Sequence, residues 1–128
     1  MEIRSYRDLE VWKKSMDLVV ECYGVTRGFP QFETFGLASQ MQRAVVSVPS
    51  NIAEGRTSAH GKEFLRYLSI AGASLAELET HIEIAERLKY IDQGIAEQLL
   101  GRAVEIGRML NGLRRSIRKR KSPLTPGT

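Results

Sequence analysis

Acidic residues surround a single histidine in the third predicted helical segment. Glu77, Glu79, His81, Glu83 and Glu86 lie within ten residues. Bundle di-metal sites use a Glu-x-x-His pair on each of two helices, whereas Glu77 and His81 are four residues apart. The other histidine, His60, falls in a loop. We therefore expect a helix-surface pair at this position, with no metal site and no cofactor.

The sequence offers no set of residues for nucleophilic catalysis. Cys22 is the single cysteine and lies on an apolar strip with no histidine near it in the sequence. A buried thiol of this kind is inert by default, and one cysteine cannot form an intrachain disulfide. The glycines are dispersed, so no phosphate-cradling loop is predicted. We expect a protein that is not an enzyme and has no catalytic residues.

The cations are concentrated at the end of the chain. Six of them lie within eight residues, and they are Arg114, Arg115, Arg118, Lys119, Arg120 and Lys121. All 15 acidic residues come earlier, so residues 1–113 carry a net charge of −2 although the whole chain carries +4. Such a block can bind nucleic-acid phosphates or an acidic protein. It can also simply complement the negative end of a helix dipole.

A second polar feature crosses an otherwise uncharged segment. Arg43, Ser47, Ser50, Asn51 and Glu54 recur every three or four residues and would share one stripe of a helix. The stripe either faces another subunit or braces the backbone around Pro49. Bracing is favoured for Ser47, whose hydroxyl can reach local carbonyls. An interface is favoured for Arg43 and Glu54, and Asn51 fits both readings.

The elements that position these residues are four amphipathic helices. The second, from about 34 to 57, should kink at Pro49 and continue, because the apolar pattern resumes beyond it. The third and fourth carry seams that step by three and four, which are Phe64, Leu68, Ala71, Leu75, Leu78, Ile82 and Ala85, then Ala96, Leu99, Ala103, Ile106, Leu110, Leu113 and Ile117. Asp92 is the expected N-cap of the fourth helix. The short loops predict an all-α, antiparallel up-down four-helix bundle over residues 1–121, with a C-terminal tail at 122–128.

Two helices carry more apolar surface than one seam needs. The first has a face of Leu9, Trp12, Met16, Val19, Val20 and Tyr23, which we assign to the core, and a second strip of Val11, Leu18 and Cys22. The third adds Tyr67, Ile70 and Ile84. These extra strips predict an oligomer interface, although wide core faces would explain them equally well. No apolar run reaches the roughly 18 residues of a membrane span, and the N-terminus has no secretory pattern, so we expect a cytoplasmic protein.

Three strings resemble a known family. YRDLEVWKKS at 6–15, SVPSNIAEG at 47–55 and SLAELE at 74–79 are similar to the four-helix-bundle family of 23S rRNA intervening-sequence proteins. That family is distantly similar to the accessory variability proteins of diversity-generating retroelements, which are basic, ring-like pentamers. The resemblance implies a bacterial cytoplasmic bundle that assembles as a homopentamer, and it implies no particular activity.

Two functions remain open at this stage. The first is a homo-oligomeric scaffold that binds RNA or DNA through the cationic block. The second is an adaptor that docks a protein partner such as a nucleic-acid enzyme or a ribosome-associated protein. The candidate interface residues are Arg43, Asn51, Glu54, Tyr67, Ile70 and Ile84.

Overall fold

A computed structural model describes residues 5–58 and 60–120 of the chain. Its elements in order are η1 (Tyr6–Asp8), α1 (Glu10–Thr26), η2 (Gln31–Glu33), α2 (Leu37–Thr57), α3 (Gly61–Arg87) and α4 (Gln93–Arg120). The predicted all-α four-helix bundle is confirmed, and the described residues contain no strand. The predicted domain boundary at 121/122 lies outside the described residues.

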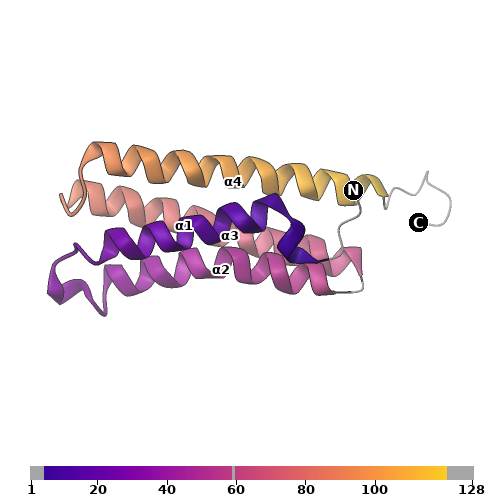
Figure 1. The fold of residues 1–128 in the computed structure, drawn as a ribbon, viewed down its shortest axis with the longest axis horizontal. Helices are drawn as coiled ribbons and strands as arrows, with labels where there is room; N and C mark the ends of the chain where they lie inside the picture. The colour runs from indigo at the N-terminus through magenta and orange to yellow at the C-terminus, as the bar shows by residue number, and fades with distance from the viewer. Residues whose placement is uncertain (1–4, 59, 121–128) are drawn as a thin grey trace.

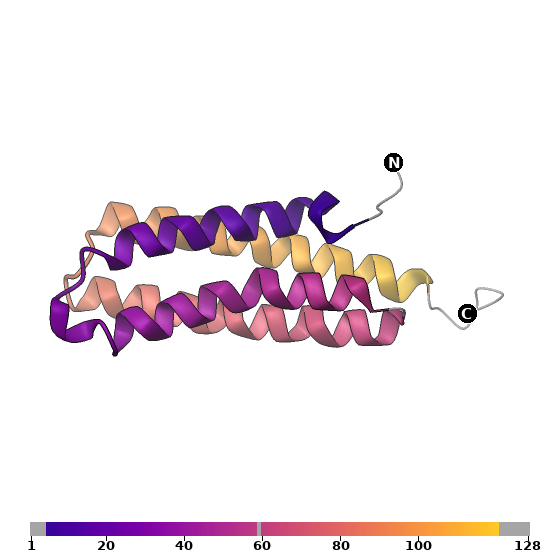
Figure 2. The same cartoon turned by 60° about the horizontal axis from the view of Figure 1, so that its bottom comes forward.

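The four long helices lie side by side and alternate in direction (Figures 1 and 2). Within the described part of the chain, the backbones of α1 and α3 each approach those of α2 and α4, whereas no close backbone approach joins α1 to α3 or α2 to α4. The two pairs α1/α3 and α2/α4 are therefore the diagonals of the bundle. The start of α1, the end of α2, the start of α3 and the end of α4 meet at one end, which we call the basic end.

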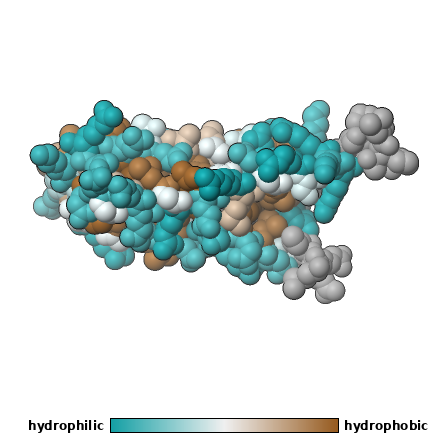
Figure 3. Space-filling view, turned by 90° about the horizontal axis from the view of Figure 1, so that it is seen from above, coloured by the Kyte–Doolittle hydropathy of each residue, from teal (hydrophilic) through white to brown (hydrophobic). Residues whose placement is uncertain are grey.

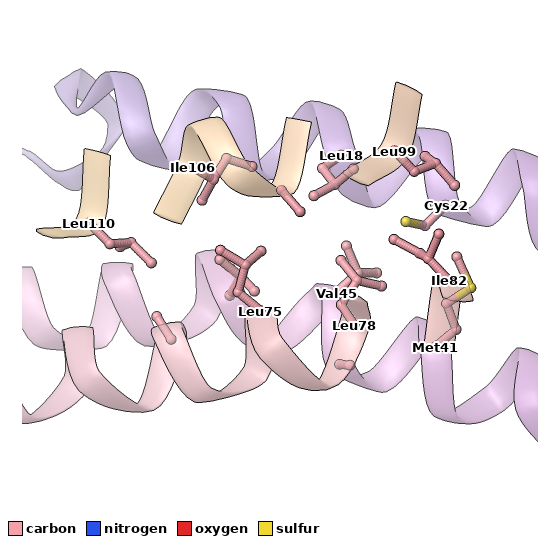
Figure 4. Packing of buried hydrophobic residues seen from close by; sticks show 14 of the residues in the cluster. Leu18, Cys22, Met41, Val45, Leu75, Leu78, Ile82, Leu99, Ile106 and Leu110 are labelled. Atoms are coloured by element: carbon pink, nitrogen blue, oxygen red, sulfur yellow. The ribbon is translucent and has the colours of Figure 1, made fainter. Parts of the chain in front are cut away.

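Apolar side chains from all four helices fill the interior (Figure 4). The predicted seams of α3 and α4 are buried or, for Phe64 and Leu113, half-buried. The apolar pattern of α2, which continues through Pro49, is buried as well, at Leu37, Met41, Ala44, Val45, Val48 and Ile52. Met41, Leu78 and Leu99 are among the fully buried side chains that join these helices. Burial of this kind is worth about 25 cal/mol per Å² of apolar surface and is the main force that holds the bundle together.

The predicted core face of α1 is wrong in part. Val11, Leu18 and Cys22 point into the core, whereas Met16, Val20 and Tyr23 are exposed, with 72% of Val20 accessible to solvent. Leu9 is buried as expected, and Trp12 and Val19 are half-buried against the core. The second strip of α1 therefore belongs to a wide core face, which was the alternative to an interface, and half of the predicted face lies at the surface.

α2 continues through Pro49, as the pattern predicted, and its ribbon bends at mid-length (Figure 2). Asn51 Nδ2 donates to the Ser47 carbonyl at 2.8 Å and to Ser47 Oγ at 2.9 Å. Ser47 Oγ also lies 2.7 Å from Ser74 Oγ on α3. The hydroxyls of Ser47 and Ser74 and the Asn51 amide therefore hydrogen-bond with one another at the α2–α3 contact. Pro49, in the same turn of α2, has no backbone N–H to donate.

Local hydrogen bonds set the ends of the helices. Asp92 caps α4, since Ile95 N donates to Asp92 Oδ1 at 2.8 Å, as predicted. Glu33 closes the start of α2 by accepting from Leu37 N at 3.0 Å. Tyr90 Oη donates to the other oxygen of Glu33 at 2.8 Å, which ties the loop before α2 to the turn before α4. We call this opposite end of the bundle the loop end.

Candidate nucleic-acid interface and exposed surfaces

The cationic block forms the last two turns of α4. Arg115, Arg118, Lys119 and Arg120 are exposed, whereas Ile117 is buried and anchors this part of the helix to the bundle. Arg114 is half-buried, and its Nε has no hydrogen-bond partner among the described residues. Lys121 lies outside the described residues. The block is therefore a helical, solvent-facing surface whose spacing is fixed by the fold.

The ion pairs seen among the described residues lie elsewhere. They include Lys13–Glu10, Lys14–Glu105, Arg66–Glu63, His81–Glu77 and Arg102–Glu21. None of these pairs involves a cation between Arg114 and Arg120. A guanidinium without a carboxylate partner keeps its full charge for a phosphate, which makes this end suited to an anionic ligand.

Other elements bring cations to the same end. Arg7 in η1, Arg56 near the end of α2 and Lys62 in the first turn of α3 join the α4 block at the basic end. Arg66 is also there, but its Nε lies 3.1 Å from Glu63 Oε1, and this hydrogen bond lowers the pKa of Glu63. The sequence analysis did not single out Arg7, because only the tertiary arrangement brings η1 to the other basic segments.

The six candidate interface residues lie on α2 and α3, two helices that pack against each other. Arg43 and Glu54 are exposed on α2, Ile70 and Ile84 are exposed on α3, and Tyr67 is half-buried beneath the Arg66 guanidinium, whose Cζ lies 4.6 Å from the ring centroid. The Asn51 amide is engaged within its own helix, which supports the bracing alternative for that residue. The contact between Ser47 and Ser74 and the close approach of Tyr67 to Gly55 bring the α2 stripe alongside α3. The use of the six residues as an interface between copies stays a prediction.

Two separate apolar strips reach the surface instead. The α1 strip consists of Met16, Val20 and Tyr23, and Val46 of α2 is also exposed. The α3 strip consists of the exposed Ile70 and Ile84, which are about four turns apart, and of the half-buried Tyr67 about one turn before Ile70. α1 and α3 are diagonal in the bundle, so the strips lie on two helices that are not neighbours. Figure 3 shows apolar atoms emerging in patches between hydrophilic ones on the face that it displays.

His81 and Cys22, the residues considered for metal binding and nucleophilic catalysis, are both buried. The described residues contain no group of three or more His, Cys, Asp or Glu side chains placed to hold a metal ion. His81 Nε2 lies 3.7 Å from Glu77, and burial lowers the pKa of His81 against the opposing effect of Glu77. Burial, reinforced by the charge of Glu21, raises the pKa of Cys22 to about 12, so this thiol stays protonated at neutral pH.

The loop end carries exposed aromatic rings that the sequence analysis missed. Phe35 is 95% exposed and Phe32 is 79% exposed. The Phe29 and Phe32 rings lie 5.4 and 6.5 Å from the Tyr90 ring, and Tyr90 in turn holds Glu33. The hint in the sequence was three phenylalanines within seven loop residues. Tyr90 therefore supports the loop through Glu33 and Phe29, while the Phe32 and Phe35 rings remain exposed to solvent.

Comparison with known proteins now identifies the family. Residues 7–112 match the family described as 23S rRNA-intervening sequence protein. This chain belongs to that family. No curated protein matches the chain, and no helix in the described part is long and apolar enough to cross a membrane.

A solved structure supports the same fold for this family member. It is a protein of unknown function from the S23 ribosomal protein family of Bacteroides thetaiotaomicron VPI-5482. It superposes with a TM-score of 0.77 at 24% identity, and the match covers 82% of this chain and 98% of that one. At this identity the likeness establishes the helical fold and carries no information about a ligand.

Proposed function

We propose that this intervening-sequence protein is a non-enzymatic, homo-oligomeric scaffold that binds RNA or other nucleic acid electrostatically at its basic end. The observation that carries the proposal is the convergence of the α4 cations with Arg7 and Lys62 from two other elements. Contacts of this kind read phosphates and not base edges, so binding should be only weakly sequence-specific.

The acidic residues are distributed in a way that supports one-ended binding. The loop end carries Glu33, Glu83, Glu86, Asp92 and Glu97. At the basic end, Glu10 and Glu63 are paired with lysine and arginine, Asp8 accepts from Ser5 N, and Glu54 is exposed, so the cations there outnumber these carboxylates. A polyanion should therefore be attracted to one end of the bundle and repelled at the other.

Fluorescence anisotropy of a labelled single-stranded RNA over a salt series tests the proposal. The triple variant Arg115→Gln, Arg118→Gln, Lys119→Gln should reduce the slope of log Kobs against log salt by about 2, because each neutralised phosphate of a single strand contributes about 0.7 to that slope. The matched control is Arg27→Gln, Arg87→Gln, Lys89→Gln, which removes the same charge from the loop end and should leave the slope unchanged. Affinity that ignores salt, or an equal weakening in both variants, would refute the proposal.

Assembly into a ring of several copies, for which we propose five, is supported by the two apolar strips on diagonal helices. A cyclic assembly needs two different complementary faces on each subunit, one for each neighbour. The α1 strip and the α3 strip provide two such faces. In a ring, the basic ends of all subunits would act together on one strand and raise its affinity through effective concentration.

A protein adaptor is the second candidate, and Phe32 and Phe35 favour it. Exposed aromatic side chains on a pre-organised support are typical anchors of protein interfaces. Pull-down from nuclease-treated lysate should retain a protein partner that Phe35→Ser loses and that the α4 triple variant keeps. Val104→Ser, at an exposed apolar position on α4, is the control.

A further inference from the structure

A stripe of polar side chains continues the cationic block along α4, away from the basic end. Arg108, Asn111, Arg115 and Arg118 step by three, four and three residues, and Lys119 lies beside Arg118. All five are exposed. Residues at this spacing share one face of a helix, and here that face is opposite the buried seam of α4. We call these five residues the outer stripe.

The middle of the outer stripe is not engaged by the rest of the bundle. Within the described residues, no ion pair or side-chain hydrogen bond involves Arg108, Asn111 or Arg115. Arg102, on the side of α4 that faces α1, differs in this respect, because its Nε lies 2.9 Å from Glu21. The outer stripe therefore offers two guanidinium groups and an amide to a ligand.

The carboxylates of α4 lie before the outer stripe. Glu105 is the last acidic residue of the chain, and it lies 3.5 Å from Lys14 Nζ of α1. Glu97, about three turns before Arg108, accepts from Gln93 at 2.9 Å. The sequence from Arg108 onwards contains cations and no acidic residue. The C-terminal half of α4, which runs along one edge of the bundle to the basic end (Figure 1), should therefore attract a polyanion over its whole length.

The geometry of the outer stripe suits an extended strand. Residues three or four apart on a helix have Cβ atoms about 5–6 Å from each other. Arg108 and Lys119 are about 16 Å apart along the helix axis. A strand that rises about 3.4 Å per nucleotide covers this length with about five nucleotides. Arginine and asparagine both donate hydrogen bonds to phosphate oxygens, so each turn of the helix can hold a phosphate.

We infer that a single RNA strand lies lengthwise on the outer face of α4, with Arg108 and Asn111 as phosphate contacts beyond the cationic block. The inference rests on the proposed function and adds the path of the strand to it. Arg7 and Lys62 then meet the strand where it leaves α4 at the basic end. The outer stripe belongs to neither apolar strip, so a ring closed through those strips would leave it open to RNA.

A charge substitution in the full chain tests this path. The readout is fluorescence anisotropy of a labelled RNA octamer over a salt series. Arg108→Gln should weaken binding about fivefold and lower the slope of log Kobs against log salt by about 0.7, the contribution of one phosphate contact. Arg87→Gln removes the same charge from an exposed position at the end of α3 and should change neither quantity.

A substitution without a change of charge separates contact from general attraction. Asn111→Ala should weaken binding of the octamer about threefold, because it removes a hydrogen bond to phosphate, and should leave the salt slope unchanged. Gln40→Ala is the matched control, since it removes an exposed amide from α2, the helix diagonal to α4. Equal affinities for these two variants would contradict a contact at Asn111.

Cross-linking reports the position of the strand directly. Burial raises the pKa of Cys22 to about 12, so a thiol-reactive benzophenone labels an introduced surface thiol selectively. Gly101→Cys places the label on the same face, about two turns before Arg108, and Gly24→Cys places it on α1. Both glycines are exposed, and a Cβ at either meets no atom within 4 Å. The octamer should cross-link to the label at position 101 and not to the label at position 24.

The outcomes separate this inference from the proposed function. If the α4 triple variant loses RNA while Arg108→Gln matches Arg87→Gln and the two labels cross-link equally, the strand does not follow α4, and the scaffold proposal stands. If the wild type binds no RNA, both proposals fail. Binding of polyglutamate in place of RNA would then assign the outer stripe to an acidic protein.

Discussion

At the scale of single residues, His81 is a polar member of the core that is incompletely satisfied. Its side chain is buried and its Nδ1 has no hydrogen-bond partner among the described residues. A buried polar atom left without a partner costs about 1–3 kcal/mol. Glu77 is exposed on the other side of the ring, so its attraction for a protonated imidazole is weakened by water. Burial therefore has the larger effect, and His81 stays neutral in the folded protein at neutral pH.

This environment predicts a loss of stability in mild acid. The folded-state pKa of His81 lies below its ordinary value of 6.5, so the unfolded chain takes up the proton first as the pH falls. The free energy of unfolding should therefore decrease from about pH 6.5 downwards, until the folded-state pKa has been passed. Urea denaturation between pH 5 and 8 measures this effect, and His81→Leu should flatten the His81 part of the slope.

The same variant also has an expected result at neutral pH. Because His81→Leu removes an unpaired buried nitrogen, it should keep or raise the stability at pH 7.5, by up to about 1 kcal/mol. Marked destabilisation at pH 7.5 would mean that the imidazole makes favourable contacts inside the bundle, and an unchanged pH slope would mean that its pKa is the same in the folded and the unfolded chain.

At the scale of elements, the close contact of α2 with α3 depends on one glycine. A Cβ at Gly55 would lie 2.7 Å from the Tyr67 Cβ and 2.9 Å from the Phe64 Cδ1. Gly55→Ala should therefore push the two helices apart and cost about 1–3 kcal/mol. Gly72→Ala is the matched control, since a Cβ there meets no atom within 4 Å, and it should stabilise α3 by about 0.5–1 kcal/mol. The melting temperatures of both variants test this prediction, and equal changes in melting temperature would contradict it.

The orientation of α1 gives a second prediction at this scale. Leu18 is fully buried, whereas Val20 is largely exposed only two positions away. Leu18→Ala should cost about 2–5 kcal/mol because it leaves a cavity in the core. Val20→Ala should change the monomer's stability by less than about 0.5 kcal/mol. Urea denaturation at a protein concentration low enough to separate the subunits measures both. The opposite ranking would restore the face that the sequence predicted.

The core-facing side of α2, α3 and α4 could be predicted from the sequence. The core-facing side of α1 could not, for a physical reason. α2, α3 and α4 each offer one dominant apolar seam, so periodicity alone finds the core. α1 offers two, and its true core strip is interrupted by Ser15, a polar residue that looks out of place there. Ser15 is buried because its Oγ donates to the Val11 carbonyl at 2.6 Å, within its own helix. That local bond is invisible in a hydropathy pattern.

Some candidate sites could likewise be predicted from the sequence, and others could not. The α4 cations could be located from sequence because they are contiguous. The aromatic pair at the loop end could not, since its support depends on packing: the Tyr90–Glu33 bond spans 57 positions of the chain.

At the scale of the whole molecule, the two ends of the bundle differ in charge, and two apolar strips follow α1 and α3 along its surface. The basic end gathers cations from η1, α2, α3 and α4, and the loop end carries most of the exposed aromatic surface of the described residues. A ring of parallel subunits would place all basic ends on one face and all loop ends on the other. A single assembly of this kind can hold an RNA on one side and a protein on the other.

Ring closure through the two strips makes a prediction about mixtures. Val20→Asp blocks the α1 strip and leaves the α3 strip intact, whereas Ile84→Asp does the reverse. If the α1 strip of one copy packs on the α3 strip of the next, each variant alone should be a monomer, because a desolvated aspartate in an apolar contact is costly. An equimolar mixture should then form a heterodimer that cannot grow, since only one of its possible contacts remains intact. Sedimentation velocity distinguishes these species. If the strips instead pair like with like, each variant alone will dimerise and mixing will add nothing, and a wild type that sediments as a 14.4 kDa monomer at micromolar concentration would exclude the ring itself.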